Sequence, residues 1–152
     1  MALFTKPEAY QKQVVIYLNS KEYENAYNLA KEFAERFGQD LTSHFLLSKS
    51  AFWLKKYPEA VVAGRKAFNM AHAKEDMLLS GIILSTAYYM LGDIKNCHEV
   101  LEAVNKDGNT DVEKLMFICA LAAKDESAAM EHINKLYKIN RRMAEDFVMR
   151  FF

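Results

Sequence analysis

Apolar residues recur along the chain at the spacing of α-helices, and polar or turn-forming residues interrupt them at regular places. The pattern predicts nine helices, at about residues 6–18, 21–37, 41–54, 58–73, 75–91, 94–105, 110–123, 126–139 and 141–152. Loops are expected at Gly92-Asp93 and at Asp107-Gly108-Asn109.

Several residues have the chemistry that begins or ends a helix. Thr5 and Glu8 have the spacing of a capping box at the start of the first helix. Asp40 and Asn140 are expected to be N-caps of later helices, because a short polar side chain there accepts hydrogen bonds from free amides. Gly38 is expected to end the second helix.

The helices are expected to pair into hairpins, because one spacing repeats. Three small residues, Ala26, Ala60 and Cys97, each follow a large apolar residue by three places, and they are separated by 34 and 37 residues. Ala129 occupies the same place in a fourth unit. Small residues allow two helices to cross closely, and each hairpin is apolar on two sides, so each must pack on both of its neighbours.

This pattern resembles the tetratricopeptide repeat (TPR), a helix pair of about 34 residues with Leu-Gly/Ala…Tyr in its first helix and Ala…Ala in its second. The matching positions are Val14…Tyr17…Ala26…Ala30, Leu47-Ser48…Ala51…Ala60…Ala67 and Leu84-Ser85…Tyr88…Gly92-Asp93…Cys97. The fourth unit departs from the pattern because Glu126 stands in place of the expected aromatic residue.

The resemblance implies an all-α, right-handed α-α superhelix of about four TPR-like hairpins plus a C-terminal capping helix. A single domain is expected over residues 1–152, with approximate repeats at 7–40, 41–74, 78–109 and 110–140 and a C-terminal helix at 141–152.

Composition narrows the possible partners and the location. Lys plus Arg and Asp plus Glu number 20 each, so no excess of positive charge attracts nucleic acid or an anionic membrane. The uncharged stretch 77–91 is too short to cross a bilayer. Cys97 and Cys119 are interpreted as buried apolar residues of a reducing compartment, and the first residues lack the pattern of a signal peptide. A cytoplasmic protein with no nucleic-acid or membrane partner is expected.

Candidate catalytic and metal-binding chemistry is sparse. The four histidines, His44, His72, His98 and His132, are isolated, and no Cys-x-x-Cys pair or Gly-rich phosphate loop occurs. The sequence therefore predicts no cofactor, no metal and no enzymatic activity.

A binding surface is implied by the resemblance, since the first helices of TPR hairpins line a concave groove. The repeat register places twelve candidate partner-binding residues there: Phe45, Leu46, Lys49, Phe52, Trp53, Leu79, Ile82, Ile83, Tyr89, Met90, Leu115 and Ile118. A TPR subgroup binds acidic C-termini through a clamp of Lys, Asn and Arg, but this chain has Gln11, Val15 and other residues at those places. The apolar groove instead suits an apolar helix or extended peptide of a partner protein.

The sequence leaves several uses of this apolar surface open. It could hold a partner as an adaptor, scaffold or assembly subunit, or shield an apolar segment as a dedicated chaperone. Two copies could bury it in a homodimer. The last helix, with Phe147, Val148, Met149, Phe151 and Phe152, could instead fold back over it. An RNA-binding repeat is disfavoured, because Lys12, Lys49 and Lys114 give the inner stripe too little positive charge.

Overall fold

The computed structural model describes residues 2–105 and 108–150, and within them the chain forms nine α-helices and no strand. The helices are α1 (Pro7–Asn19), α2 (Tyr23–Arg36), α3 (Leu41–Trp53), α4 (Tyr57–Met70), α5 (Lys74–Met90), α6 (Ile94–Val104), α7 (Thr110–Ala122), α8 (Glu126–Ile139) and α9 (Arg141–Met149). All nine expected helices are present, with ends within a few residues of those predicted.

The four hairpin turns are built alike. The residue five places before each small register residue has a positive φ: 60° at Lys21, 62° at Lys55, 78° at Gly92 and 59° at Lys124. The next amide then donates to the carbonyl five residues earlier, from Glu22 to Tyr17, Lys56 to Ala51, Asp93 to Tyr88 and Asp125 to Ala120, each at 2.9 Å. This is the Schellman motif, and its recurrence brings the fourth unit into the same register.

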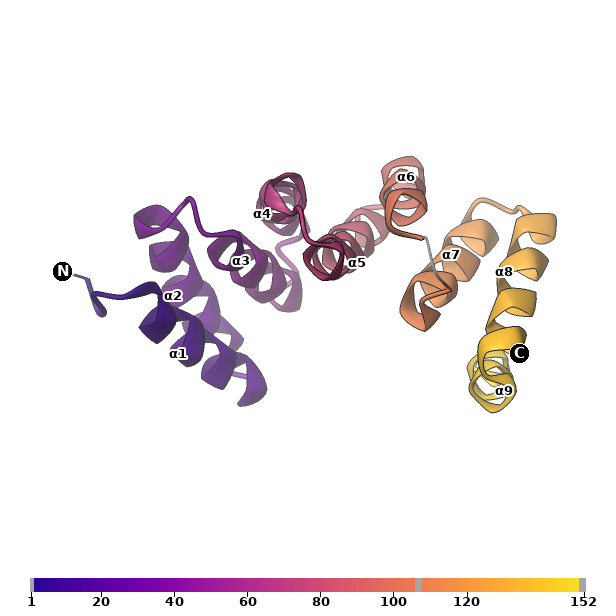
Figure 1. Cartoon of the computed structure of the whole chain (residues 1–152), viewed down its shortest axis with the longest axis horizontal. Coiled ribbons are helices and arrows are strands. Elements are labelled where there is room, and N and C mark those ends of the chain that lie inside the picture. Colours follow the sequence, from indigo (N-terminus) through magenta and orange to yellow (C-terminus); the bar gives the residue numbers. More distant parts are fainter. Residues whose placement is uncertain (1, 106–107, 151–152) are drawn as a thin grey trace.

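Consecutive helices pack side by side from α1 to α9, and the chain forms an arched stack (Figure 1). Beyond consecutive helices, close backbone contacts join α1 to α3, α3 to α5 and α5 to α7, whereas α2, α4, α6 and α8 make no such contact with one another in the described chain. Helices α1, α3, α5 and α7 therefore line the inner side of the arch. Figure 1 shows α4 and α6 on the opposite side.

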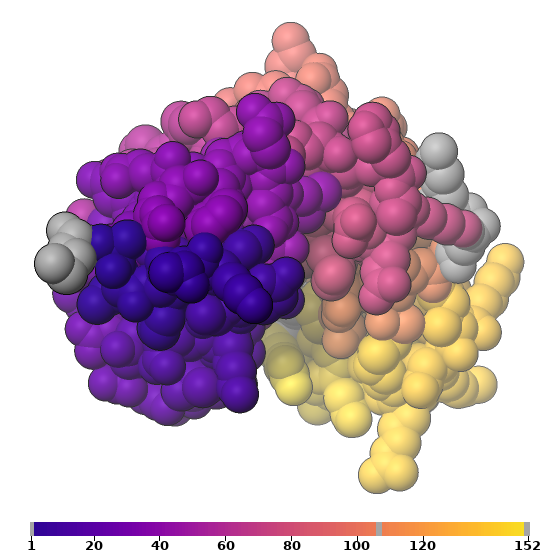
Figure 2. Space-filling model, turned by 60° about the vertical axis from the view of Figure 1, so that its left-hand side comes forward, coloured from indigo at the N-terminus to yellow at the C-terminus, as the bar shows by residue number. Residues whose placement is uncertain are grey.

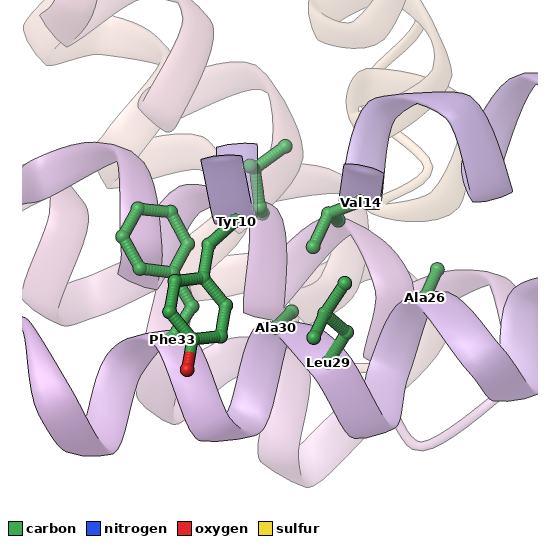
Figure 3. Packing of buried hydrophobic residues seen from close by; sticks show 7 residues of the cluster. Tyr10, Val14, Ala26, Leu29, Ala30 and Phe33 are labelled. Carbon is green, nitrogen blue, oxygen red and sulfur yellow. The ribbon is translucent and has the colours of Figure 1, made fainter. Parts of the chain in front are cut away.

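The first hairpin holds its helices together with an apolar core (Figure 3). Tyr10 of α1 stacks on Phe33 of α2 with ring centroids 5.5 Å apart and planes within 11°. Arg36 donates a hydrogen bond to the Tyr10 hydroxyl at 2.8 Å and another to the carbonyl of Phe4. Ala26 and Ala30 are fully buried, as expected for positions where helices cross closely.

The third unit contains an insertion relative to the second. Helix α5 has 17 residues and α3 has 13, and the difference lies at the beginning of α5, before Leu78 in the repeat register. The three-residue excess in the repeat spacing is therefore accommodated by lengthening a helix, which leaves the hairpin turn at Gly92 unchanged.

Helix α9 closes the end of the stack. It packs on α8, and its buried Ala144 and Phe147 join Ile133 and Leu136 in one core cluster. The Phe147 ring also meets Phe117 of α7 edge-on, with centroids 5.6 Å apart. Among the described residues, α9 does not lie over α3 or α5, so the alternative in which the last helix covers the groove is wrong for residues 141–150.

Two predicted helix ends are wrong. Lys6, not Thr5, is the N-cap of α1, and it makes no side-chain cap, because Pro7 in the first turn holds the preceding residue extended. Gly38 has no positive φ, because α2 already ends before Phe37, whose ring packs on Phe33. The predicted caps Asp40 and Asn140 do accept backbone hydrogen bonds, from Thr42 and Met143. Asp107, Phe151 and Phe152 lie outside the described residues.

Candidate partner-binding groove

The inner face carries a pocket of about 270 Å³ where α1, α3 and α5 meet, hereafter the inner pocket. Its lining residues are Gln11, Val15, Leu18, Asn19, Leu41, Thr42, Phe45, Leu46, Lys49, Asp76, Leu79 and Ser80. Apolar side chains from three successive units converge here, with Lys49 and Asp76 as the charged residues. In Figure 2 a notch separates the N-terminal hairpin from the C-terminal helices on the lower side of the view.

Four of the twelve predicted site residues lie together in the inner pocket: Phe45, Leu46, Lys49 and Leu79. Leu79 is 47% exposed, whereas Phe45 and Lys49 are partly buried. Leu46 is a correction, because it is only 4% exposed and packs in the core with Val14. It supports the pocket from behind and has little surface to offer a partner.

An aromatic patch lies at the hairpin-turn end of α3 and includes the predicted residues Phe52 and Trp53. Trp53 is 49% exposed and stacks on Tyr23 of α2 with centroids 5.4 Å apart and planes within 9°. Phe52 meets Trp53 edge-on at 5.8 Å and Tyr57 at 5.5 Å. The tryptophan is thus held in one orientation while half of its surface remains open.

The remaining predicted residues lie further along the stack and are more buried. Ile82, Tyr89 and Leu115 are partly buried and pack against the core cluster of Cys97, Leu101, Val112, Met116 and Cys119. Ile118 packs in the same way against the last cluster, and Ile83 is also partly buried. Met90 is 46% exposed. The structure therefore does not gather the predicted residues in a single pocket.

Sequence reasoning missed five lining residues, Asn19, Leu41, Thr42, Asp76 and Ser80. Thr42 stands at the register position of Leu79, so the same counting would have found it. Asp76 lies in the inserted turn of α5. This turn has no counterpart in the other units, so the repeat spacing assigns no position to its residues. Ser80 is fully buried at the edge of the pocket, and its hydroxyl has no hydrogen-bond partner among the described residues.

A larger pocket of about 550 Å³ lies on the outer side between α2 and α4, hereafter the outer pocket. Ala34, Leu47 and Ala63 contribute apolar surface, and Val62 at its edge is 58% exposed. Lys31, Glu35, Glu59 and Lys66 also line it, so it carries charges of both signs. The outer pocket is the main alternative to the inner pocket as a docking site.

The described residues form neither a metal-binding cluster nor a membrane-spanning helix. No group of three or more His, Cys, Asp or Glu side chains lies close enough to hold a metal ion. No helix among them has the length and apolar character needed to cross a membrane.

Comparison with solved structures identifies the fold. The chain is similar to YrrB, described as a TPR protein with an unusual peptide-binding site, with a TM-score of 0.72 and 15% identity over 87% of this chain and 68% of that one. It is similar to TTC0263, a TPR protein of Thermus thermophilus, with a TM-score of 0.75 and 13% identity over 95% and 82%. A TPR protein of Bacteroides fragilis, BF2334, has a TM-score of 0.61 and 21% identity over 93% and 66%.

These likenesses define the class of fold: the chain is an all-α, TPR-like helical-repeat superhelix, as the sequence predicted. No protein-family model matches the sequence, and a search of curated proteins finds no match either. At 13–21% identity these similarities show the fold, and a shared fold does not specify a function.

Proposed function

We propose that this protein is a non-enzymatic protein-interaction module that binds an apolar helix or extended peptide of a partner protein along its inner face. The observation that carries the proposal is the exposure of apolar side chains on α1, α3 and α5. Val15 is 39% exposed, Leu79 47% and Met90 46%, while Trp53 at the end of α3 is 49% exposed. Exposed apolar surface on a monomer is characteristic of binding sites.

The packing supports a largely preformed site. Consecutive helices bury continuous cores, and Leu46 behind the inner pocket belongs to one of them. Tyr23 and Phe52 hold the Trp53 ring in place. A partner that contacts Val15, Phe45 and Leu79 therefore meets a surface whose side chains lose little freedom on binding, which favours affinity.

Two further considerations favour the inner face as the site. Helix α9 closes the end of the stack and leaves α3 and α5 uncovered within the described chain. YrrB, which shares the fold, is described as having a peptide-binding site. An adaptor or assembly subunit in the cytoplasm fits this surface and the two free cysteine thiols.

The decisive experiment is selection of binders from a displayed library of random peptides, followed by binding measurements on two variants. Leu79→Asp places a charge in the inner pocket, and Val62→Asp places one at the edge of the outer pocket, at a residue that is even more exposed. We expect the selected peptides to be rich in apolar residues. Leu79→Asp should weaken their binding at least tenfold, or about 1.4 kcal/mol, and Val62→Asp should leave it unchanged. If only Val62→Asp lost binding, the binding site would lie on the outer face and the proposal would be wrong.

A second candidate is self-association through the aromatic patch. Trp53 is 49% exposed, and Met90 and Leu91, each 46% exposed, stand at the turn end of the next inner helix, so the apolar surface continues between units. Sedimentation of the wild type and of Trp53→Ala tests this candidate. A dimer that dissociates in the variant would favour it, and a monomer at micromolar concentration would exclude it. Shielding of an apolar segment by a dedicated chaperone would use the same inner face as the first proposal.

A further inference from the structure

The chain has two cysteines, and the fold brings them together. Cys97 lies in the first turns of α6 and Cys119 near the end of α7, 22 residues further along the chain. The two sulfur atoms are 2.8 Å apart. Both residues are buried, with exposures of 0% and 2%, so the contact is part of the core between the third and fourth hairpins.

The repeat register makes this contact distinctive. Cys97 occupies the place that Ala26, Ala60 and Ala129 fill in the other units, and all four residues are buried. A methyl group is therefore enough for packing at this position. The thiol adds a reactive atom at the junction of two units, directly opposite another thiol.

The environment makes the two thiols unequal. The hydrogen bond with Cys119, together with burial, raises the pKa of the Cys97 thiol. The same hydrogen bond lowers the pKa of Cys119, since a sulfur that accepts a proton is stabilised as the thiolate. Either sulfur can be the donor of this hydrogen bond, and with Cys97 as the donor Cys119 is the better nucleophile of the pair.

We propose that Cys97 and Cys119 are a redox modification site, at which hydrogen peroxide converts the two thiols into a disulfide between α6 and α7. The Cys119 thiolate attacks one peroxide oxygen, the O–O bond breaks, and hydroxide leaves as Cys119 becomes a sulfenic acid. The Cys97 sulfur then attacks the Cys119 sulfur, its proton and the sulfenic hydroxyl leave as water, and the S–S bond forms. Two thiols and one peroxide thus yield one disulfide and two waters.

The geometry requires little movement for the second step. A disulfide has an S–S distance of about 2.05 Å, so less than an ångström of approach separates the two thiols from a bond. Peroxide must reach a buried sulfur, and the junction favours this, because α6 and α7, like α8 and α9, pack less extensively than the other consecutive helices of the described chain. Brief opening of that junction exposes Cys119 to a molecule little larger than water.

The consequence is a covalent link across one of the two less extensively packed junctions of the described chain. The cluster that contains both cysteines also packs Ile82 of α5 and Leu115 of α7, so the bond fixes the outer helix of the third unit against the inner helix of the fourth. In a protein exposed to a reducing cytosol such a bond is reversible and serves as a sensor of oxidation. This inference does not depend on the proposed binding function.

The test uses the whole chain, fully reduced, treated with hydrogen peroxide and then denatured and labelled with a maleimide. We expect the untreated protein to take up two labels and the treated protein none, with uptake restored by dithiothreitol. Trypsin should release a linked pair of peptides, residues 96–106 and 115–124. The bond would close the loop between Cys97 and Cys119, which are 22 positions apart. The melting temperature of the oxidised protein should therefore rise by roughly 5–10 °C.

Cys97→Ala is the matched variant, because alanine fills this place in the other units, and Cys119→Ala is the second. Neither should gain thermal stability on treatment. The proposal is overturned if treated wild type still takes up two labels, if the linked peptides come from two different chains, or if the melting temperature does not rise. Oxidation of methionines adds mass but neither blocks the maleimide nor links peptides, so it does not confuse the readout.

Discussion

The carboxylate of Glu113 in α7 lies 2.6 Å from Nδ1 of His132 in α8, and both residues are buried, at 1% and 7% exposure. This pair joins the two helices of the fourth hairpin inside their apolar interface. A polar group left alone in such a place loses its hydrogen bond without regaining water.

His132→Ala should therefore destabilise the protein by about 3 kcal/mol, measured by urea unfolding, because it leaves the buried Glu113 side chain without its partner. Lys135→Ala in the same helix removes an exposed partner of Glu131, at 3.2 Å, and should change the stability by less than about 0.5 kcal/mol. Equal effects of the two substitutions would show that burial does not govern the strength of the Glu113–His132 contact.

Replacement of the hairpin-turn lysines by glycine should stabilise the protein. Lys21, Lys55 and Lys124 have positive φ, a conformation that is unfavourable for residues with a Cβ atom, and glycine at the equivalent Gly92 avoids it. Lys55→Gly should raise the free energy of unfolding by about 0.5 kcal/mol, and the triple variant by about 1–2 kcal/mol. Lys66→Gly, inside α4, should instead lower it by about 1 kcal/mol. A destabilised triple variant would contradict the backbone argument.

Two buried serines should respond oppositely to alanine. The Ser80 hydroxyl has no partner within the described residues, so Ser80→Ala should stabilise the fold by about 1 kcal/mol. The Ser48 hydroxyl donates to the carbonyl of Ala60 at 2.7 Å, so Ser48→Ala should destabilise it by a similar amount, about 1 kcal/mol. Thermal melting of both variants checks the pair, and a loss of stability in Ser80→Ala would reveal a partner for that hydroxyl.

The stability of the protein should fall at high pH partly because of Tyr27. Its hydroxyl donates to Glu59 of α4, and this bond together with burial raises the pKa of Tyr27 from 10 to about 12. Between those values the unfolded chain releases a proton that the folded chain retains, so the contribution is complete below pH 10 and is lost as the pH rises toward 12. Urea unfolding of wild type and Tyr27→Phe across this range should show the steeper decline in the wild type. Parallel curves would mean that the Tyr27 hydrogen bond does not survive in solution.

The repeat architecture could be predicted because it depends on residues whose spacing is visible in the sequence. Ala26, Ala60, Cys97 and Ala129 are all buried where helices cross, as their register required. The turns were harder to predict from the sequence, because three of the four have lysine at the position where glycine is the usual signal. The repeat spacing revealed that the third unit has extra residues but not that they lie at the start of α5. A longer helix accommodates extra residues without a break in its apolar pattern.

The candidate site was harder to predict, because register assigns a face of a helix but not the depth of a side chain. Leu46 and Leu79 were assigned to the same surface, yet Leu46 is 4% exposed and Leu79 47%. The difference arises from the first hairpin, whose Val14 and Leu29 share a core cluster with Leu46. The approach of Cys97 to Cys119 likewise depends on how two units are rotated against each other, which no spacing within one unit records.

The two sides of the stack are joined in different ways. Backbones of alternate helices approach one another only on the odd-numbered side in the described chain, while α2 and α4 are linked through side chains such as Tyr27 and Glu59. The arch therefore resembles a hand fan, in which the ribs meet at one edge and spread at the other. A change of curvature would therefore alter the spacing of α2, α4, α6 and α8 more than that of α1, α3, α5 and α7, because only the latter are joined by direct backbone contacts in the described chain.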